Sequence, residues 1–340
     1  MSRSIPHPRA AFVAAGLLAL LGACQTPPAD DGAKHGKAVD GEAVPAAATT
    51  GEPAAEPGTQ PETASAKTSL ERLFRYLPSD ATGVAYDRSG QRFDPEALSV
   101  VFAIPPKTSA LLDHRTLLDE GLDIVLDGDA DPEHWLSPIS LGFTLTVGRD
   151  PYFLRPLTKP VAELAPLLEQ GFNASEAHGV SVWLPTGAFP WKIAILADDE
   201  LAAFIPVDAM GTGVEPLLAA TTLEESAIET QLVEALAPDP SLELVLVGAQ
   251  PGPHFDLDQS IAQVQFGLRQ GQGGGYEGQV VLAPTGDIDA AVTQLRARKH
   301  PEENLQIQAL LGAVEFVPER GGVVGRLVVE RDQLKHLVER

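Results

Sequence analysis

The chain begins with a short apolar run that ends at its only cysteine. Residues 10–23 carry no charged side chain, and Arg3 and Arg9 precede them. This run of 14 residues is shorter than the roughly 20 that a helix needs to cross a bilayer. A basic start, a short apolar centre and small residues at the end are typical of a secretory signal peptide. Because Cys24 is the only cysteine, everything after it must fold without an internal disulfide.

The end of this run resembles the signal of bacterial lipoproteins. The three residues before the cysteine are Leu21, Gly22 and Ala23, an order similar to the lipobox of that family. The resemblance covers only the first 24 residues. It implies cleavage before Cys24, a diacylglycerol on its thiol and attachment to a membrane through this lipid anchor. Gln25 after the cysteine resembles the outer-membrane default of Gram-negative sorting. The implied location is therefore the bacterial outer membrane, facing the periplasm, with surface exposure left open.

A long linker follows the cysteine. Residues 24–67 consist mainly of Ala, Pro, Thr, Gly and Glu, and Val39 and Val44 are their only larger apolar residues. Such a segment cannot bury enough surface to offset its conformational entropy, and its prolines favour extended conformations. We expect a disordered Pro/Ala-rich tether between the lipid and the folded domain.

The chain is strongly acidic, with a formal net charge of −23. Residues 68–240 hold 27 acidic and 10 basic side chains, a net of −17, whereas residues 241–340 have a net of −4. This charge repels nucleic acids and anionic lipid headgroups. We therefore expect no nucleic-acid partner, and the charge favours a basic protein partner in the envelope.

Strand patterns dominate the region after the linker. From Ile139 to Val147, apolar residues alternate with small polar ones, which indicates a strand with one buried face. Short apolar segments at 180–184, 192–197 and 201–207 follow in close succession, the pattern of antiparallel strands. Further strands are expected at 83–86, 242–247, 261–268, 276–283, 313–317 and 323–329.

Helical segments interrupt these strands. Asp94 and Asp287 precede helical patterns as N-caps, and another helix is expected after Pro106. A helix is also expected at 159–170, weakened by Pro166. Antiparallel strand groups broken by amphipathic helices, without regular βα alternation, predict an α+β fold made mainly of antiparallel sheets.

The expected organisation has four parts: a signal peptide at 1–23, the tether at 24–67, an acidic α+β domain or half at 68–240, and a second α+β domain or half at 241–340. A faint repeat supports two related halves. The pattern Gly-x-x-Val-x-x-Pro-Thr-Gly from Gly179 recurs from Gly278. Turn residues also recur by chance and the segments after the two matches differ, so a duplication and a coincidence both stay open.

Three acids at alternate positions form the most suggestive polar motif. Asp127, Asp129 and Asp131 have the spacing by which a calcium loop presents carboxylate oxygens to one cation. An EF-hand needs Gly where Pro132 stands and Glu where Pro138 stands. A weak site for calcium or another divalent cation competes with a solvated acidic loop.

The same residues allow a second interpretation, as part of a hydrolase. An apolar segment ending in Asp127 and Asp129 resembles the start of haloacid-dehalogenase-type phosphatases. That resemblance implies metal-dependent hydrolysis, with Asp198 and Asp199 as the distant pair that holds Mg²⁺. Asp131 stands where that family has threonine, and antiparallel strands replace its βα units.

The sequence lacks the common catalytic motifs. The eight histidines do not pair at zinc-ligand spacing, and the sequence has no Gly-x-Ser-x-Gly motif. We therefore expect a membrane-anchored envelope lipoprotein with a non-catalytic binding or scaffolding domain and no cofactor. The alternative is a carrier of a hydrophobic ligand such as a lipid, because half-polar sheets crossed by amphipathic helices can enclose an apolar cavity.

Overall fold

The computed structural model describes most of the chain after the linker. The described residues are 70–126, 132–146, 150–196, 198, 200–221, 227–236, 239–249, 257–271, 274–299, 304–319 and 321–334. The predicted signal peptide, Cys24 and the tether lie outside the described residues, as do Asp127, Asp129 and Asp131.

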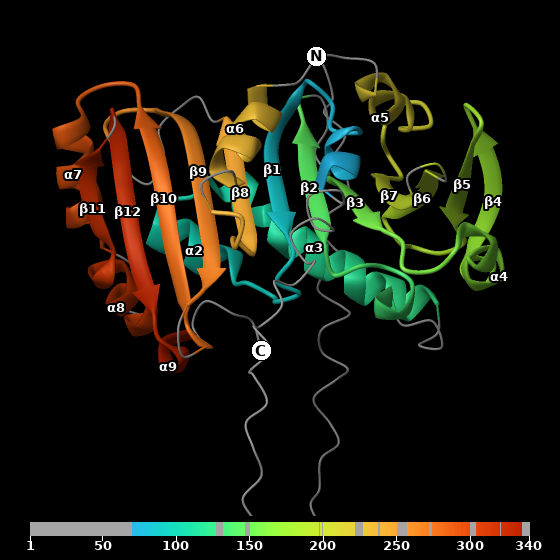
Figure 1. Ribbon diagram of the computed structural model, residues 1–340, viewed down its shortest axis with the longest axis horizontal. Coiled ribbons are helices and arrows are strands. Elements are labelled where there is room, and N and C mark those ends of the chain that lie inside the picture. Colours follow the sequence, from blue (N-terminus) through green and yellow to red (C-terminus); the bar gives the residue numbers. More distant parts are fainter. Residues whose placement is uncertain are drawn as a thin grey trace, which may run out of the picture. The chain divides into compact units, whose positions relative to one another are not determined.

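The described strands form one antiparallel sheet of twelve, in the order β11-β12-β10-β9-β8-β1-β2-β3-β7-β6-β5-β4 (Figure 1). The predicted α+β fold with antiparallel strands is confirmed. The strands are β1 (Ala81–Asp87), β2 (Ser140–Leu145), β3 (Tyr152–Pro156), β4 (Phe172–Ala177), β5 (Val180–Pro185), β6 (Trp191–Leu196), β7 (Leu201–Pro206), β8 (Leu244–Ala249), β9 (Ile261–Gln270), β10 (Tyr276–Pro284), β11 (Glu315–Glu319) and β12 (Gly322–Val329).

Helices connect the strands. The α-helices are α2 (Pro95–Phe102), α3 (Pro106–Val125), α4 (Ala165–Leu168), α5 (Glu215–Ala220), α6 (Ala227–Leu236), α7 (Ile288–Ala297), α8 (Leu305–Ala313) and α9 (Arg331–Leu334), and the 3₁₀ turns are η1 (Pro132–His134) and η2 (Val161–Glu163). None of the helices in this part of the chain is both long and apolar enough to cross a membrane.

The chain follows the same path twice, outward from the central pair β1 and β8. From β1 it adds β2 and β3, crosses through α4 to the edge strand β4, and returns until β7 pairs with β3. From β8 it adds β9 and β10, crosses through α7 and α8 to the edge strand β11, and returns as β12 beside β10. We call the strands β1–β7 half one and β8–β12 half two.

The sequence repeat does not follow this correspondence. It matches the start of β5 with β10, whereas the strand that holds the place of β10 in half one is β3. The repeated Gly and Pro residues therefore mark similar turns rather than equivalent strands. The boundary expected at residue 240 falls just before β8, which pairs with β1 across it, so strands from both sides share the sheet.

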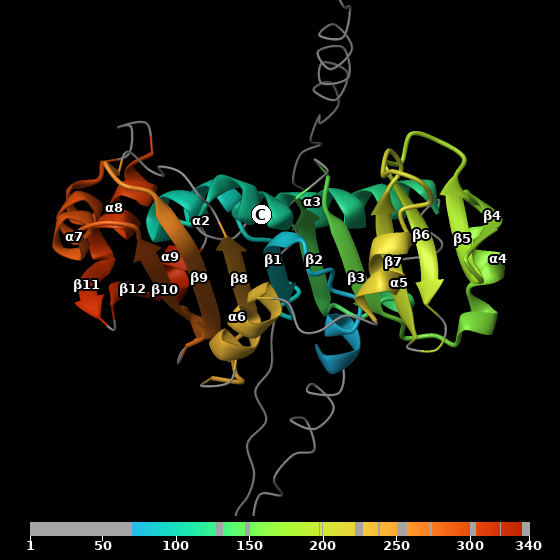
Figure 2. The same cartoon turned by 90° about the horizontal axis from the view of Figure 1, so that it is seen from above.

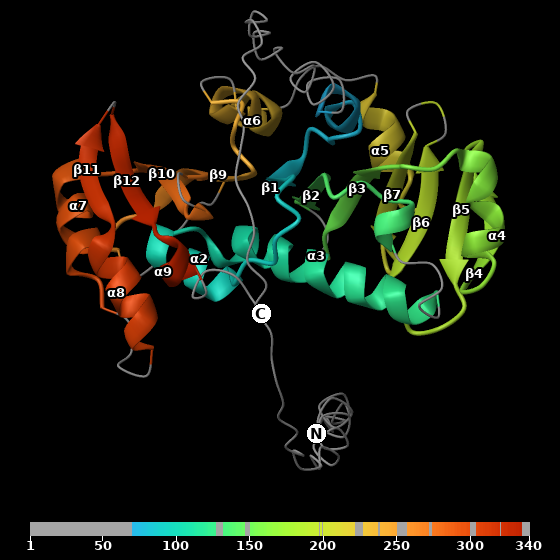
Figure 3. The same cartoon turned by 60° about the horizontal axis from the view of Figure 1, so that its bottom comes forward.

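Helices cover the two faces of the sheet unequally. The α3 face carries α2, α3, α4, α7 and α8, and the opposite α6 face carries α5, α6 and the helical residues 70–74 (Figures 2 and 3). Alternation along β8 shows the division: Leu246 packs under α3 and Val247 packs under α6.

Two glycines bring α3 close to the centre of the sheet. Gly83 of β1 pairs with Gly248 of β8, and Thr108 of α3 lies above both. A Cβ at Gly248 would stand 2.5 Å from the Thr108 Oγ1, closer than side-chain atoms can approach. From this contact α3 runs across β1 and β2, and its later turns, including Leu118, reach a second apolar cluster beneath half one.

One predicted helix fails on particular residues. The helix expected at 159–170 is instead η2 and the single turn α4, because Pro160 and Pro166 lack the N–H groups that a continuous helix needs. The strands β3 and β4 and the helices α5 and α8 were not predicted.

Candidate functional site

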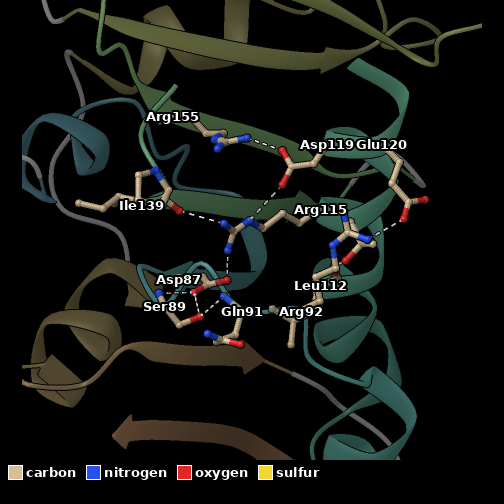
Figure 4. Close-up of polar contacts among 12 residues, drawn as sticks. Asp87, Ser89, Gln91, Arg92, Leu112, Arg115, Asp119, Glu120, Ile139 and Arg155 are labelled. Carbon is tan, nitrogen blue, oxygen red and sulfur yellow. Dashed lines mark hydrogen bonds and ion pairs between the residues drawn. The ribbon is translucent and has the colours of Figure 1, made fainter. Parts of the chain in front are cut away.

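A polar cleft of about 640 Å³ lies beside α3, between the turn after β1 and the segment from η1 to β3. Four charged side chains form its floor, and they come from three elements that are distant in the sequence (Figure 4). We call Asp87, Arg115, Asp119 and Arg155 the ionic cluster. The cleft is lined by Asp87, Gly90, Gln91, Arg92, Phe93, Leu112, Arg115, Thr116, Asp119, Glu120, Asp123, Pro132, Leu136, Pro138 and Arg155.

Arg115 is the centre of the cluster. It stands on the buried side of α3, in line with Leu111 and Leu118, and it is 8% exposed. Its Nη1 donates to the carboxylate of Asp87, and its Nη2 donates to the carbonyl of Pro138 at 2.9 Å. A guanidinium buried in this way needs such partners, because an unpaired buried charge is costly.

Asp87 ends β1 and is 1% exposed. One carboxylate oxygen accepts the Ser89 backbone N–H at 2.8 Å and the Ser89 hydroxyl at 2.7 Å. The other faces Arg115. The turn after the strand therefore holds Asp87 in place, with Ser89 in turn accepting from the Gln91 N–H at 3.0 Å.

Arg155 extends the cluster from β3. It is 3% exposed, and its Nε and Nη2 donate to the Ser137 carbonyl at 3.1 and 2.8 Å. Its Nη1 donates to Asp119, whose second oxygen lies 3.9 Å from the Arg115 Nε. With a side chain that is 30% exposed, Asp119 is the member most open to the cleft.

The four charges alternate in sign and cancel. Burial lowers the pKa of Arg115 to about 10, with a further lowering by Arg155 and an opposite effect of Asp119. The guanidinium therefore stays charged at neutral pH. Because each arginine is held by a carboxylate and a backbone carbonyl, the floor is suited to orienting polar groups rather than to exchanging protons.

The rim of the cleft on α3 is acidic. Glu120 pairs with Arg92 at 2.8 Å, and both side chains are about half exposed. Asp123, one turn further along α3, is exposed to solvent. The lining as a whole contains four carboxylates and three guanidinium groups, so it has a small negative excess.

None of the residues predicted as a metal site is among the described residues that line the cleft. Asp127, Asp129 and Asp131 lie outside the described residues, immediately before Pro132, which lines the cleft. Among the described residues, His, Cys, Asp and Glu form no group of three that could hold a metal. The cation site at those aspartates stays a prediction.

Sequence reasoning missed the ionic cluster, although one signal was present. Arg115 occupies a position of the apolar stripe of α3, between Leu111 and Leu118. A charge inside an apolar stripe needs a buried partner, and Asp119 four residues later is such a candidate on the same helix.

Comparisons with known proteins give little beyond this. No protein-family model matches the chain, and no curated protein matches it. Two chains among solved structures match, and one of them is crystal form I of TP0453. The match covers 77% of this chain and 94% of the TP0453 chain, with 10% identity and a TM-score of 0.46. A likeness of this degree carries no argument about function.

Proposed function

We propose that this protein is a lipoprotein of the bacterial envelope whose folded domain binds a partner and does not catalyse a reaction. The cleft carries this proposal. Its volume of about 640 Å³ is in the range of ligand sites, and its floor consists of charges that hold one another. A floor of this kind offers fixed hydrogen-bonding geometry without a free nucleophile or base.

The charge of the surroundings favours a cationic partner. The acidic rim with Asp123 belongs to the segment 68–240, which has a net charge of −17. Long-range attraction of this sign speeds encounter with basic proteins and is weakened by salt. We infer that a basic side chain of the partner enters the cleft beside Asp119 and Asp123.

A carrier of a hydrophobic ligand is the second candidate, and the structure gives it less support. Most apolar side chains on both faces of the sheet are packed into three clusters of buried residues. The large cleft is lined by charged groups, and burying an acyl chain against them would leave those groups poorly solvated.

The binding proposal is tested by reversing one charge at the rim. Asp123→Lys places a cation where we expect the partner's cation, and Glu315→Lys makes the same change on β11, away from the cleft. Full-length protein is purified from envelope extracts at low and at high salt. We expect wild type and Glu315→Lys to retain a basic protein at low salt and to lose it at high salt, and Asp123→Lys to lose it in both.

Two outcomes would contradict this proposal. One is a complex that is insensitive to both salt and Asp123→Lys. The other is the recovery of a bound lipid with no protein, which would favour the carrier.

The anchor is tested separately. Cys24→Ala removes the thiol that the lipobox resemblance assigns to diacylglycerol, so the variant should leave the detergent phase on phase partitioning. Gln25→Ala keeps the thiol and should partition like wild type. A Cys24→Ala protein that stays with the membrane fraction would show that the lipobox interpretation is wrong.

A further inference from the structure

The two edges of the sheet differ in how they are protected. Edge strands present unpaired backbone groups, and proteins commonly block them with proline or charge. The edge strand β11 has both, since Pro318 stands between Glu315 and Glu319 within five residues. The other edge, β4, contains no proline and one charged residue, Glu176, and four consecutive residues, 173–176, are exposed.

The hydrogen-bond pattern shows which backbone groups β4 turns outward. The Thr186 N–H donates to the Gly171 carbonyl at 3.0 Å, and β4 and β5 then pair residue by residue without a bulge. Hydrogen-bonded pairs alternate along antiparallel strands, so the backbone groups of 173, 175 and 177 face β5. Those facing outward belong to Phe172, Ala174 and Glu176, and of these residues Phe172 is buried, so the open groups are those of Ala174 and Glu176.

No other strand in the described part of the chain pairs with this edge (Figure 1). In the middle of the strand the side chains of Ala174 and Ser175 are small, so they leave an incoming backbone room to approach. A regular edge with exposed backbone groups is the template that strand addition uses in peptide recognition.

We propose that β4 is a docking edge for an extended segment of a basic partner protein, which adds a strand to the sheet. The exposed charges on β4 and on the segment that leads into it indicate the sign of the partner. Glu176 lies on β4, and Glu163 and Glu169 lie on the segment that leads into it. Lys159 is the basic residue of this segment, so the three carboxylates leave a negative excess. A second copy of this chain fits less well, because each copy brings the same acids and a net charge of −23.

This inference goes beyond the proposed function, since it needs neither the cleft nor the lipid anchor. The probe is a short synthetic peptide of alternating lysine and valine, added to the full-length protein in detergent. Its control is the same peptide with alternate backbone nitrogens methylated, which keeps the charge and removes the hydrogen bonds of one edge.

Amide hydrogen exchange reads the result residue by residue. The unmethylated peptide should slow exchange at Ala174 and Glu176, whose N–H groups face outward on exposed residues. The alternate amides at 173, 175 and 177 are already bonded to β5 and should change little. Slowing at neither set, or equal slowing by the methylated peptide, would overturn the proposal.

A matched pair of variants at one position gives the second measurement. Ala174→Pro removes an outward donor without removing a bond to β5, a placement that edge strands tolerate. Ala174→Val keeps the donor. We expect Ala174→Pro to weaken peptide binding by about tenfold, because it removes one hydrogen bond and its ring crowds the incoming strand. Ala174→Val should bind the peptide like wild type.

Equal binding by both variants would contradict strand addition. Sedimentation of the peptide-free protein tests the other occupant: a wild-type dimer that Ala174→Pro dissociates would assign the edge to self-association and overturn the proposal of a basic partner. The Asp123→Lys variant should bind the peptide normally, which separates this edge from the cleft.

Discussion

The two halves of the sheet follow the same path but are buried differently. In half one, every residue of β3, β6 and β7 is buried. In half two, burial alternates along β9 and β10, because the α6 face of β10 and β12 carries exposed residues such as Gln279 and Arg326. A sheet covered on both faces needs continuous apolar strands, and a sheet covered on one face needs alternation.

This difference shows that topology alone does not set the sequence of a strand. The segments WKIAIL of β6 and IAQVQFGLRQ of β9 are both strands inside the same sheet, and the layer above each decides its pattern. The ionic cluster lies on the α3 face, and its two strand residues, Asp87 of β1 and Arg155 of β3, belong to half one. Along α3, the residues before Arg115 pack in the apolar cluster of half two and those after it pack in a cluster of half one. Arg115 therefore lies between the two clusters.

The largest expected effect comes from placing a carboxylate on the α6 face of each half. Ala203 of β7 is fully buried, whereas Gln279 of β10 is exposed on the same face of the sheet. Ala203→Glu buries an unpaired charge, a cost of several kcal/mol that is comparable with the ~5–15 kcal/mol stability of a typical domain. Gln279→Glu should change stability by less than about 0.5 kcal/mol. Urea denaturation followed by circular dichroism measures both, and similar losses would refute the contrast.

The same contrast explains which strands could be predicted from the sequence. Alternation identified β2, and short apolar segments identified β6 and β7. The strand β3 was missed because Arg155 interrupts its apolar residues and prolines flank it. The edge strand β4 was missed because exposed residues such as Asn173 and Glu176 give no hydrophobic period.

The site was less predictable than the fold. Arg115 lies 28 positions from Asp87, and Asp119 lies 36 positions from Arg155, so both pairs exist only once the strand order is known. The sequence marks the burial of Arg115 by its apolar neighbours along α3, but it does not indicate which carboxylate it meets. Leu117, although apolar, is 48% exposed, since it lies on the other side of the helix from Leu118.

The second prediction concerns the ionic cluster between α3 and the sheet. Arg115→Met leaves Asp87 buried without its partner, and breaking one side of a buried ion pair costs about 3–5 kcal/mol. Arg92→Met breaks the exposed pair with Glu120 and should cost less than about 1 kcal/mol. The double variant Asp87→Asn with Arg115→Met should be more stable than Arg115→Met alone. A double-mutant cycle on the free energy of unfolding measures this difference. Equal urea midpoints for the two single variants would show that the cluster does not fasten α3 to the sheet.

The third prediction concerns how the stability of the protein depends on pH through α5, a helix on the α6 face of half one. The pKa of Glu215, at the start of α5, is lowered to about 2 by its own backbone N–H first and also by Thr212 and His178, against an opposing effect of burial. Because the folded pKa lies below the unfolded value of 4.5, the stabilisation is present above pH 4.5 and is lost as pH falls toward 2.

The size of this effect is limited by solvent. The Glu215 side chain is 43% exposed, so after allowance for screening we expect about 1 kcal/mol. Glu215→Gln should remove this acid-dependent component from the urea midpoints, and Glu315→Gln on β11 should leave it unchanged. An acid profile that is identical in wild type and Glu215→Gln would contradict the assignment.

The smallest expected effect tests whether the α6 face of half two is open in the full-length protein. Val328 of β12 is 67% exposed and Val324, on the same strand and face, is 3% exposed. Val328→Lys should therefore change stability by less than about 0.5 kcal/mol, while Val324→Lys, as the positive control, should be strongly destabilising. If Val328→Lys costs more than about 1 kcal/mol in the full-length chain, another segment or a partner covers this face. Half two would then be buried on both faces like half one, and the polar alternation of β9 and β10 would need a different cause.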